Sequence, residues 1–315
     1  MGSLSGKVAL VAGATRGAGR GIAVMLGEAG ATVYCTGRSI SGRPATPGRT
    51  ETIDETADMV TAAGGNGIPL QVDHTVNAQV ESLCSRIKAE QGGLDILVNG
   101  VWGGDALTEF GKAFWKVSLD KGHVMMERAI FSHIITAHYA VPLMFNRPHG
   151  LVVEMTDGES FTYRGNIFYD LVKTSVIRLA FIMARELRKR PVTALALTPG
   201  FIRSEDVLDR FGVNENNWRD ALRTEPNLIA SESPNFVGRA VAALAADPEV
   251  FSKAGRVHTT WDLAMEYGFT DTNGERPNWG EYFAEKYGAY RICDGGFYEY
   301  WRGGPIELVF PNWPE

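Results

Sequence analysis

The chain has 315 residues, of which 44% are hydrophobic and 22% are charged, a balance that excludes a disordered protein and is ordinary for a globular one. Its 31 Lys and Arg against 37 Asp and Glu give a formal net charge of −6, so a protein that binds the phosphate backbone of nucleic acids is not expected. The cysteines, Cys35, Cys84 and Cys293, are too scattered for a disulfide framework or a metal-binding knuckle.

The apolar runs are too short for a membrane protein and do not resemble a secretion signal. These runs stay well below the roughly 18 residues of a membrane span. The apolar run near the N-terminus is short and breaks at glycines, unlike the core of a signal peptide. The six histidines include no pair with the spacing of metal ligands. We therefore expect a cytoplasmic protein with no membrane partner and no metal.

Short apolar runs alternate with longer amphipathic segments over the first two-thirds of the chain. Such runs, rich in Val, Ile and Leu, are typical of strands buried on both faces. Alternation of strands with helices predicts right-handed crossovers and a parallel sheet covered on both sides, an α/β doubly wound fold of the Rossmann type. The expected strands are residues 7–13, 31–37, 66–73, 94–100, 150–156 and 192–200, and the expected helices are 17–29, 51–63, 75–90, 121–145 and 167–189.

The last part of the chain differs in composition. Residues 1–250 are expected to form one continuous domain, in which the polar segment 199–235 follows a late strand and so lies at the ligand-binding edge of the sheet. Residues 251–315 are rich in Trp, Tyr, Phe, Gly and Pro and are too few for an independent core. We expect them to pack on the domain or on a neighbouring subunit, with Trp301 and Trp313 in a packing role rather than as a cover over a cleft.

Three glycines follow the first expected strand directly. Gly13, Gly17 and Gly19 lie in VAGATRGAGRGIA, residues 11–23. Glycines permit a tight turn and a close approach of the backbone to a pyrophosphate, and the N-terminus of the next helix attracts that anion. A tight turn that binds no ligand would use the same residues. The position of this glycine motif after the first strand of an alternating chain nevertheless favours a dinucleotide site.

The second expected strand ends with Thr36, Gly37 and Arg38. A free ribose 2′-hydroxyl usually meets Asp or Glu at this point. Arg38, with Arg16 in the glycine loop and Ser39 beside it, suits a 2′-phosphate because guanidinium groups form paired, charge-assisted hydrogen bonds with phosphate. The alternative is that both arginines are solvated loop charges. The sequence predicts NADP(H) rather than NAD(H).

Tyr169 and Lys173 lie four residues apart within the expected helix 167–189. This spacing puts both side chains on one face of a helix. A free tyrosine has a pKa of about 10, and a neighbouring ammonium group lowers it by favouring the phenolate. Such a tyrosine can exchange a proton with a substrate oxygen. A tyrosine and a lysine on a helix surface with no catalytic role have the same spacing. The catalytic interpretation of this pair therefore depends on the other motifs of the chain.

Taken together, these motifs resemble the short-chain dehydrogenase/reductase family, and the order and intervals of the motifs are those of the family. Within it the chain is most similar to bacterial relatives of the dehydrogenase/reductase member 1 group, through ATVYCTGRS at 31–39 and KAFW at 112–115. The motifs that carry the family resemblance are AGATRGAG at 12–19, Asp73, LVNG at 97–100, Tyr169 with Lys173, and PGFIRS at 199–204.

The resemblance implies a role for each matching residue. Asp73 would bond the adenine amino group, Asn99 would lie under the adenosine ribose, and Lys173 would bond the nicotinamide ribose. Ile202 and Ser204 would hold the carboxamide and the pyrophosphate side. The residues implied at the phosphates are Gly13, Thr15, Arg16, Gly17 and Gly19, with Arg16, Arg38 and Ser39 at the 2′-phosphate.

The chain departs from the family at the catalytic serine, where it has Thr156 and Asp157. Thr156 lies 13 residues before Tyr169, a usual family interval, and its hydroxyl can orient a substrate carbonyl. We therefore expect Thr156 to act with Tyr169 and Lys173. An interval of 12 selects Asp157 instead, whose ionised carboxylate accepts a hydrogen bond but donates none. Ser160 is a further hydroxyl candidate.

Two more positions differ from the family. Asn99, Gly100, Val101 and Trp102 stand where the family has Asn-Asn-Ala-Gly, so Trp102 is expected to shape the substrate site. The family's relay asparagine, on the helix before the fifth strand, is missing, and Glu127 lies at about its position. The proton relay is therefore expected to be altered or to reach solvent by another route.

These observations predict an NADP(H)-dependent oxidoreductase that interconverts a small-molecule carbonyl and an alcohol. The alternatives are a nucleotide-binding protein of the same fold with altered or lost catalysis, such as a sensor or scaffold, and, with less support, an epimerase or dehydratase. The residues around the expected substrate pocket favour an apolar substrate. The resemblance implies a homodimer or homotetramer that associates through helices 121–145 and 167–189.

Overall fold

The computed structural model describes residues 2–159 and 163–287. In these residues parallel strands form a seven-stranded sheet in the order β3-β2-β1-β4-β5-β6-β7. The order reverses between β1 and β4, which confirms the expected doubly wound α/β fold. The strands are β1 Val8–Ala12, β2 Thr32–Gly37, β3 Asn66–Gln71, β4 Ile96–Asn99, β5 Gly150–Met155, β6 Val192–Thr198 and β7 Val257–Thr259.

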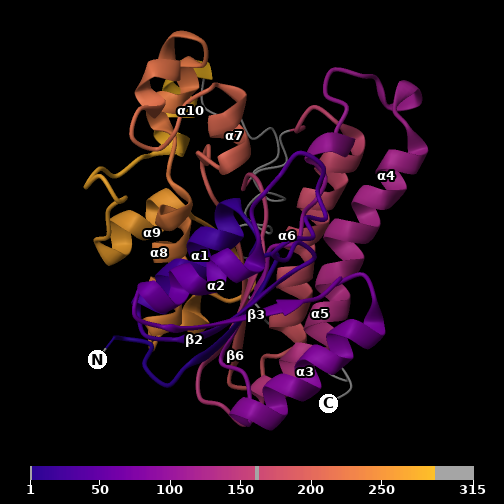
Figure 1. Cartoon of the computed structure of the whole chain (residues 1–315), viewed down its shortest axis with the longest axis vertical. Helices are drawn as coiled ribbons and strands as arrows, with labels where there is room; N and C mark the ends of the chain where they lie inside the picture. Colours follow the sequence, from indigo (N-terminus) through magenta and orange to yellow (C-terminus); the bar gives the residue numbers. More distant parts are fainter. Residues whose placement is uncertain (1, 160–162, 288–315) are drawn as a thin grey trace.

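Helices cover both faces of the sheet (Figure 1). α1, α2, α8 and α9 lie on one face, and α3, α4, α5 and α6 lie on the other. Their bounds are α1 Gly17–Glu28, α2 Ile53–Ala62, α3 Asn77–Gln91, α4 Leu119–Met126, α5 Ser132–Ala140, α6 Ile167–Glu186, α7 Glu205–Arg210, α8 Pro234–Ala246, α9 Thr260–Tyr267 and α10 Trp279–Tyr287. None of the helices in the described part of the chain is both long and apolar enough to cross a membrane.

The central strands are buried on both faces, which explains their continuous apolar sequences. In β1, Ala9 and Val11 belong to the core formed with α1 and α8. Val8 and Leu10 point the other way, into the core formed with α3 and α5. Successive side chains of a strand alternate between faces, so both sets must be apolar.

The start of α6 positions the tyrosine–lysine pair. The Asn166 side chain accepts hydrogen bonds from the backbone N–H groups of Phe168 and Tyr169, at 3.0 and 3.1 Å. Such a cap satisfies N–H groups that have no partner within the helix and sets where the helix begins. Tyr169 therefore lies in the first turn, and Lys173 one turn later.

The structure differs from the expected elements in two places. The helix expected at 121–145 is divided into α4 and α5 by a π-helical turn, Glu127–Phe131. The sheet also continues past residue 250, because β7 pairs with β6 through Val257 and Ala196. A strand of three residues is too short to be recognised from its apolar pattern, and its pairing is a tertiary contact.

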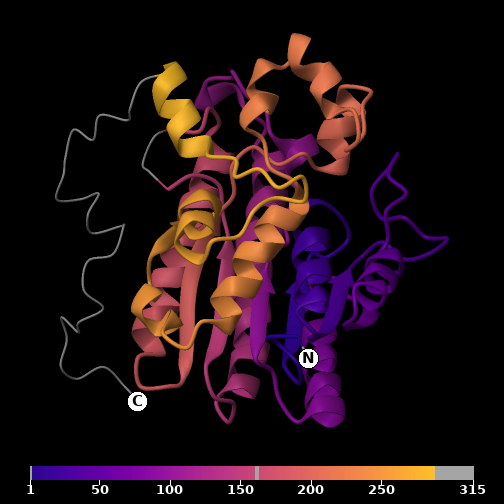
Figure 2. The same cartoon turned by 90° about the vertical axis from the view of Figure 1, so that its left-hand side faces the viewer.

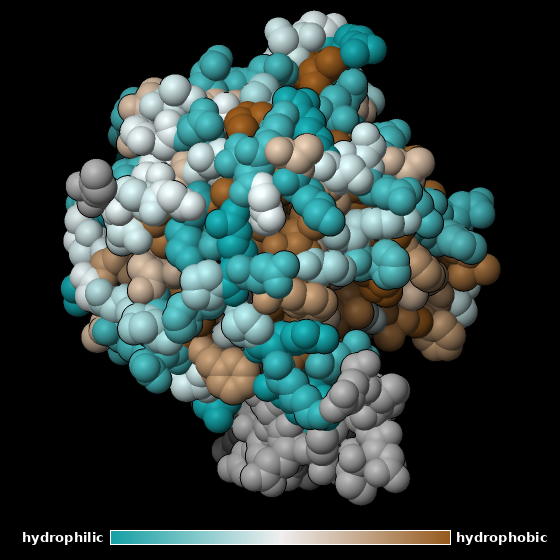
Figure 3. All heavy atoms as spheres, turned by 90° about the horizontal axis from the view of Figure 1, so that it is seen from below, coloured by the Kyte–Doolittle hydropathy of each residue, from teal (hydrophilic) through white to brown (hydrophobic). Residues whose placement is uncertain are grey.

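The two ends of the sheet differ. The insertion after β6, with α7 and α10, covers the end at which the strands finish (Figures 1 and 2). The opposite end, seen from below in Figure 3, is hydrophilic over much of its surface, and its hydrophobic residues are most frequent toward the right-hand side. Ligand sites in doubly wound sheets lie at the carboxyl ends of the strands, under this insertion.

Candidate active site

A cavity of about 1030 Å³ opens at the carboxyl ends of the strands. This volume is at the upper end of the range of small-molecule sites. Its walls bring together the glycine loop, the basic residues after β2, the tyrosine–lysine pair and the loop after β6. The predicted site residues on these walls are Gly13, Thr15, Arg16, Gly17, Gly19, Arg38, Ser39, Asp73, Thr156, Tyr169, Lys173, Ile202 and Ser204.

The glycine loop has the shape that a phosphate cradle requires. Gly13 and Gly17 have φ values of 89° and 55°, in the left-handed region that favours glycine. A Cβ on Gly13 would lie 2.8 Å from the carbonyl oxygen of Gly100, and one on Gly19 would lie 2.0 Å from the carbonyl oxygen of Gly13. The loop therefore depends on glycine at these positions, and it brings the N-terminus of α1 to the cavity wall.

A carboxylate of the protein itself occupies the N-terminus of α1. Glu205, the first residue of α7, accepts a hydrogen bond from the backbone N–H of Gly17 at 2.7 Å. Its other oxygen lies 3.6 Å from the guanidinium of Arg20. A helix N-terminus favours anions, so Glu205 takes the position that suits a phosphate.

The basic residues after β2 lie on the same wall. Arg38 is partly exposed, and its guanidinium is 3.8 Å from the carboxylate of Asp73. Arg16 lies 3.4 Å from the carboxylate of Glu51, and its Nε is buried without a hydrogen bond to the described residues. The hydroxyl of Ser39 is buried and accepts a hydrogen bond from the backbone N–H of Ala45 at 3.0 Å. The two guanidinium groups keep hydrogen-bonding capacity for a further anion.

Asp73 lies on the wall as expected, but its carboxylate already has partners. One oxygen accepts from the backbone N–H and the hydroxyl of Thr75, at 3.0 and 2.7 Å. The other oxygen faces Arg38. A carboxylate has further acceptor sites, so a contact with an adenine amino group stays a prediction.

Asn99 is the one predicted residue that does not lie on the cavity wall. It is fully buried, and its amide donates to Glu154 on the neighbouring strand at 2.6 Å. Glu154 in turn lies 2.6 Å from Nδ1 of His133, whose Nε2 is 3.0 Å from the carbonyl oxygen of Val101. These contacts hold the end of β4 in place, and the position of Asn99 under a ribose stays a prediction.

The hydroxyl of Tyr169 donates a hydrogen bond to Asp157 at 2.7 Å. The hydroxyl of Thr156 instead donates to the backbone carbonyl of Lys173 at 2.8 Å. Of the two intervals left open by the sequence, the residue at the shorter one, Asp157, makes the contact with Tyr169. Thr156 also lines the cavity, and its catalytic role stays a prediction. Ser160 lies outside the described residues.

Aromatic rings surround the tyrosine and the lysine. The rings of Trp102 and Phe110 meet the ring of Tyr169 edge-on, with centroids 5.3 and 5.5 Å away. The ammonium of Lys173 lies 4.2 Å from the centroid of Trp102, within range of a cation–π interaction. Trp102 therefore lies at the reactive groups, where the sequence predicts that it shapes the substrate site.

Burial and charge set the protonation of this pair. Burial raises the pKa of the Tyr169 phenol above its usual value, and the carboxylate of Asp157 raises it further. Burial lowers the pKa of the Lys173 ammonium, against the opposite effect of Asp157 and Asp105. The pKa of the tyrosine is therefore raised rather than lowered as expected, because burial disfavours the phenolate and the hydroxyl contacts a carboxylate rather than an ammonium group. Tyr169 is therefore neutral and able to donate its proton.

The π-helical turn Glu127–Phe131 lies beside the cavity. Its first residue, Glu127, lines the cavity. Such turns occur frequently at functional sites because they leave backbone groups outside the regular ladder. The turn therefore places the Glu127 carboxylate on the cavity wall, and its part in a proton relay stays a prediction.

A buried carboxyl supports the loop after β6. The backbone N–H of Gly200 and the hydroxyl of Thr260 both donate to one oxygen of Glu232, at 3.0 and 2.7 Å. The other oxygen is buried without a hydrogen bond to the described residues. Burial raises the pKa of Glu232 to about 8, so this group is largely protonated at neutral pH.

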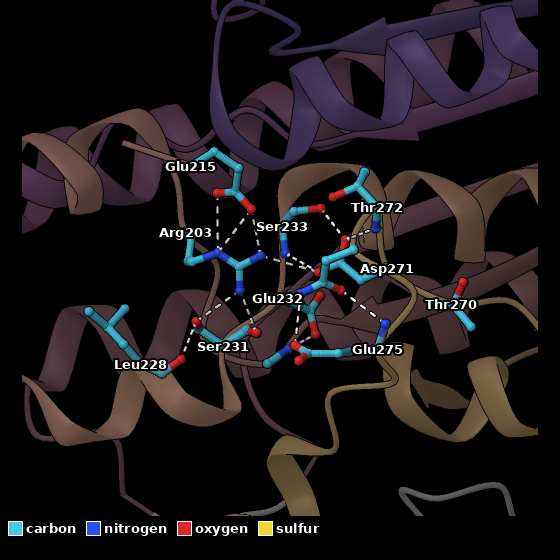
Figure 4. Close-up of polar contacts among 12 residues, drawn as sticks. Arg203, Glu215, Leu228, Ser231, Glu232, Ser233, Thr270, Asp271, Thr272 and Glu275 are labelled. Carbon is cyan, nitrogen blue, oxygen red and sulfur yellow. Dashed lines mark hydrogen bonds and ion pairs between the residues drawn. The ribbon is translucent and has the colours of Figure 1, made fainter. Parts of the chain in front are cut away.

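The next residues tie the same loop to the insertion. Arg203 is buried and pairs with Glu215 and Asp271, at 2.6 and 3.3 Å (Figure 4). It also donates to the carbonyl of Ser231 at 2.6 Å. A buried guanidinium needs such partners, and they fix Ile202, its neighbour, on the cavity wall.

The C-terminal segment contributes to the cavity. Trp279, the first residue of α10, lies on the wall, and a Cβ on Gly200 would lie 2.6 Å from its Cβ. An aromatic residue of 251–315 thus helps to close the cavity, whereas a packing role is expected from the sequence alone. Trp301 and Trp313 lie outside the described residues.

Three acidic residues of the site were not predicted. Glu154 is a carboxylate inside an otherwise apolar strand, a pattern that marks a buried polar contact. Glu205 and Glu232 lie in polar surroundings in the sequence, where a glutamate carries no signal. Their roles arise from contacts with Gly17 and Gly200, which are distant in the chain.

The chain matches known proteins over most of its length. The family model for short chain dehydrogenase matches residues 7–211. Dehydrogenase/reductase SDR family member 1 of Mus musculus is 32% identical over 315 residues, covering 98% of this chain and 96% of that protein. The 3-oxoacyl-[acyl-carrier-protein] reductase FabG of Escherichia coli is 27% identical over 268 residues, covering 84% and 99%.

A solved structure has the same fold. L-sorbose reductase from Gluconobacter frateurii, complexed with NADPH and L-sorbose, matches with a TM-score of 0.67 and 20% identity, over 82% of this chain and 96% of that chain. The family match and the identity to the mouse protein lead to one conclusion. The chain belongs to the short-chain dehydrogenase/reductase family and is related to dehydrogenase/reductase SDR family member 1.

Proposed function

We propose that the protein is an NADP(H)-dependent oxidoreductase that interconverts a small-molecule carbonyl and an alcohol, with Tyr169 as the proton donor and acceptor. One observation carries the proposal. Tyr169 and Lys173 line the same cavity as the glycine loop that begins with Gly13. The family binds nicotinamide cofactors, and the L-sorbose reductase of similar fold is in complex with NADPH.

The residues present fit a dinucleotide. The glycine loop leaves space that any Cβ would fill, and the N-terminus of α1 suits a pyrophosphate. Ser204 caps α7 beside this loop and lies within reach of the same group. When bound, a reduced nicotinamide supplies a hydride to the substrate carbon. Arg16 and Arg38 favour a 2′-phosphate, since no carboxylate side chain ends β2.

The reactive groups suit reduction of a carbonyl. Tyr169 is protonated and its hydroxyl faces the cavity beside Asp157. As a carbonyl oxygen gains negative charge, it takes the proton of Tyr169. The ammonium of Lys173, 5.5 Å from the centroid of the Tyr169 ring, stabilises the phenolate that remains. In the oxidation of an alcohol the same groups work in reverse.

The test is Tyr169→Phe. We expect this variant to lose turnover of carbonyl substrates while NADPH binding, followed by fluorescence titration, stays nearly unchanged. Tyr139→Phe on α5 is the matched control, because Tyr139 does not line the cavity. Full activity in Tyr169→Phe would refute the assignment.

One observation favours a second candidate, a nucleotide-binding protein with altered or lost catalysis. A carboxylate, Asp157, contacts the Tyr169 hydroxyl in place of the family serine. A sensor or scaffold would bind NADPH tightly and show no turnover on a broad panel of carbonyl compounds. Turnover that depends on Tyr169 would decide against this candidate.

A further inference from the structure

We infer that the substrate is an α-hydroxy carbonyl compound, and that Asp157 binds its hydroxyl group while Tyr169 binds its carbonyl oxygen. The inference rests on the proposed function and names the substrate class of the same site. It follows from the single hydroxyl proton of Tyr169 and from the hydrogen-bond partners of Asp157 and its neighbours.

The first step concerns the single proton of the Tyr169 hydroxyl. In the structure this proton is directed at Oδ2 of Asp157, over 2.7 Å. A carbonyl oxygen must accept the same proton to be activated. A productive substrate therefore displaces Asp157 from the tyrosine.

The second step concerns what is left behind. The donors nearest in the chain already have partners. The hydroxyl of Thr156 donates to Lys173, and the backbone N–H of Gly158 donates to Thr198. Arg164 reaches the backbone carbonyl of Asp157 at 2.6 Å. In the described residues the carboxylate of Asp157 has Tyr169 as its one hydrogen-bond partner.

The third step is energetic. When the partly buried carboxylate of Asp157 loses this donor, it keeps the charge attraction of the Lys173 ammonium but loses the stabilisation of its one hydrogen bond. A simple ketone brings an acceptor but no donor, so it takes the proton of Tyr169 and leaves Asp157 unpaired. An α-hydroxy ketone brings both. Its carbonyl accepts from Tyr169, and the hydroxyl on the adjacent carbon donates to Asp157.

The reaction balances without a change at Asp157. The carbonyl carbon gains a hydride from NADPH, the π electrons of the C=O bond move to the oxygen, and this oxygen takes the proton of Tyr169. NADPH is oxidised to NADP⁺, and the product is a vicinal diol. The carboxylate stays ionised and keeps the hydroxyl of the substrate as its donor throughout.

The aromatic residues that line the rest of the cavity determine which ketones are suitable for the test. Trp102, Phe110 and Trp279 all line the cavity, so an aromatic ketone suits it. We choose 2-hydroxyacetophenone and acetophenone, which differ only in the hydroxyl. Only the hydroxy ketone forms a hydrogen bond with the charged Asp157. We therefore expect the kcat/KM of the wild type to be about 10- to 100-fold higher for 2-hydroxyacetophenone than for acetophenone.

Two variants test the role of Asp157. Asp157→Ala removes the acceptor, so the two ketones should become nearly equal substrates. Asp157→Ser restores a group that can donate to a carbonyl, so turnover of acetophenone should rise above that of the wild type. Thermal unfolding of both variants checks that each is folded.

A binding measurement gives a readout that does not depend on turnover. In the presence of NADP⁺, which cannot reduce a ketone, calorimetry should show that the wild type binds 2-hydroxyacetophenone at least about tenfold more tightly than acetophenone, and that Asp157→Ala loses this difference. Equal binding of the two compounds by the wild type would overturn the inference.

The outcomes separate the inference from the proposed function. Equal kcat/KM for both ketones, or an unchanged preference in Asp157→Ala, would overturn the role of Asp157 and leave the oxidoreductase assignment standing. Turnover that survives in Tyr169→Phe would overturn the assignment itself, and the inference with it.

Discussion

Replacing Glu205 by glutamine should strengthen NADPH binding. In the structure Glu205 accepts from the N–H of Gly17 at 2.7 Å and so occupies the N-terminus of α1. If the pyrophosphate binds there, this contact must break, and the carboxylate then also repels the phosphates. Both effects oppose binding, and both are weakened in Glu205→Gln because the amide is neutral.

The size of the effect follows from the contact. A hydrogen bond to a charged group contributes about 1.5–3 kcal/mol, and a charge at a helix N-terminus about 0.3–1 kcal/mol. The Glu205 side chain is 25% exposed, and the glutamine amide remains a weaker acceptor, so the expected loss is smaller than that of a full hydrogen bond to a charged group. About 1 kcal/mol corresponds to roughly fivefold tighter binding of NADPH.

The assay is a fluorescence titration with NADPH, with the melting temperature of the ligand-free protein as a second measurement. The same contact stabilises the free protein, so Glu205→Gln should melt about 1–2 °C lower. Asp209→Asn is the control, because it makes the same charge change on α7 at a side chain that is 68% exposed. Unchanged or weaker NADPH binding in Glu205→Gln alone would refute the reasoning.

Three further changes test the cofactor pocket, the buried carboxyl and the assembly. Arg38→Asp should weaken NADPH by at least about tenfold and leave NADH nearly unaffected, since a carboxylate repels the 2′-phosphate; equal effects in titrations of both cofactors would contradict the NADP(H) preference. The pKa of Glu232 is raised from 4.5 to about 8 in the folded protein, so the protonated form favours folding and its stabilisation is lost as the pH rises between these values. Glu232→Gln should therefore melt progressively higher relative to the wild type as the pH rises through this range, and a constant difference would contradict the assigned protonation. Light scattering should show a homodimer or homotetramer that Ile134→Glu on α5 dissociates and Met59→Glu on α2 does not, because both side chains are exposed and only α5 belongs to the expected interface; a monomeric wild type would exclude it.

Much of the fold could be predicted because its signals are local. Strands buried on both faces must be apolar at successive positions, as in β1. The turn after β1 requires φ values that favour glycine, so Gly13 and Gly17 are visible in the sequence. The spacing of Tyr169 and Lys173 is likewise a property of a single helix.

The choice between Thr156 and Asp157 could not be made in this way. Both intervals to Tyr169 are acceptable in the sequence, and the outcome depends on how the chain leaves β5 and packs against α6. Thr156 faces the backbone of α6, and its neighbour faces the hydroxyl. The pKa of Tyr169 is raised by burial first and by this contact second, so its direction differs from the expected one.

The sequence by itself determined the alternation of strands and helices, the glycine turn after β1 and the shared helix of Tyr169 and Lys173, because each depends on neighbours in the chain. The tertiary structure alone decided that Glu205 meets Gly17, that Glu232 supports Gly200 and that Trp279 closes the cavity. These contacts join segments that are far apart in sequence, and a side chain gives no sign of a partner until the fold brings the two together.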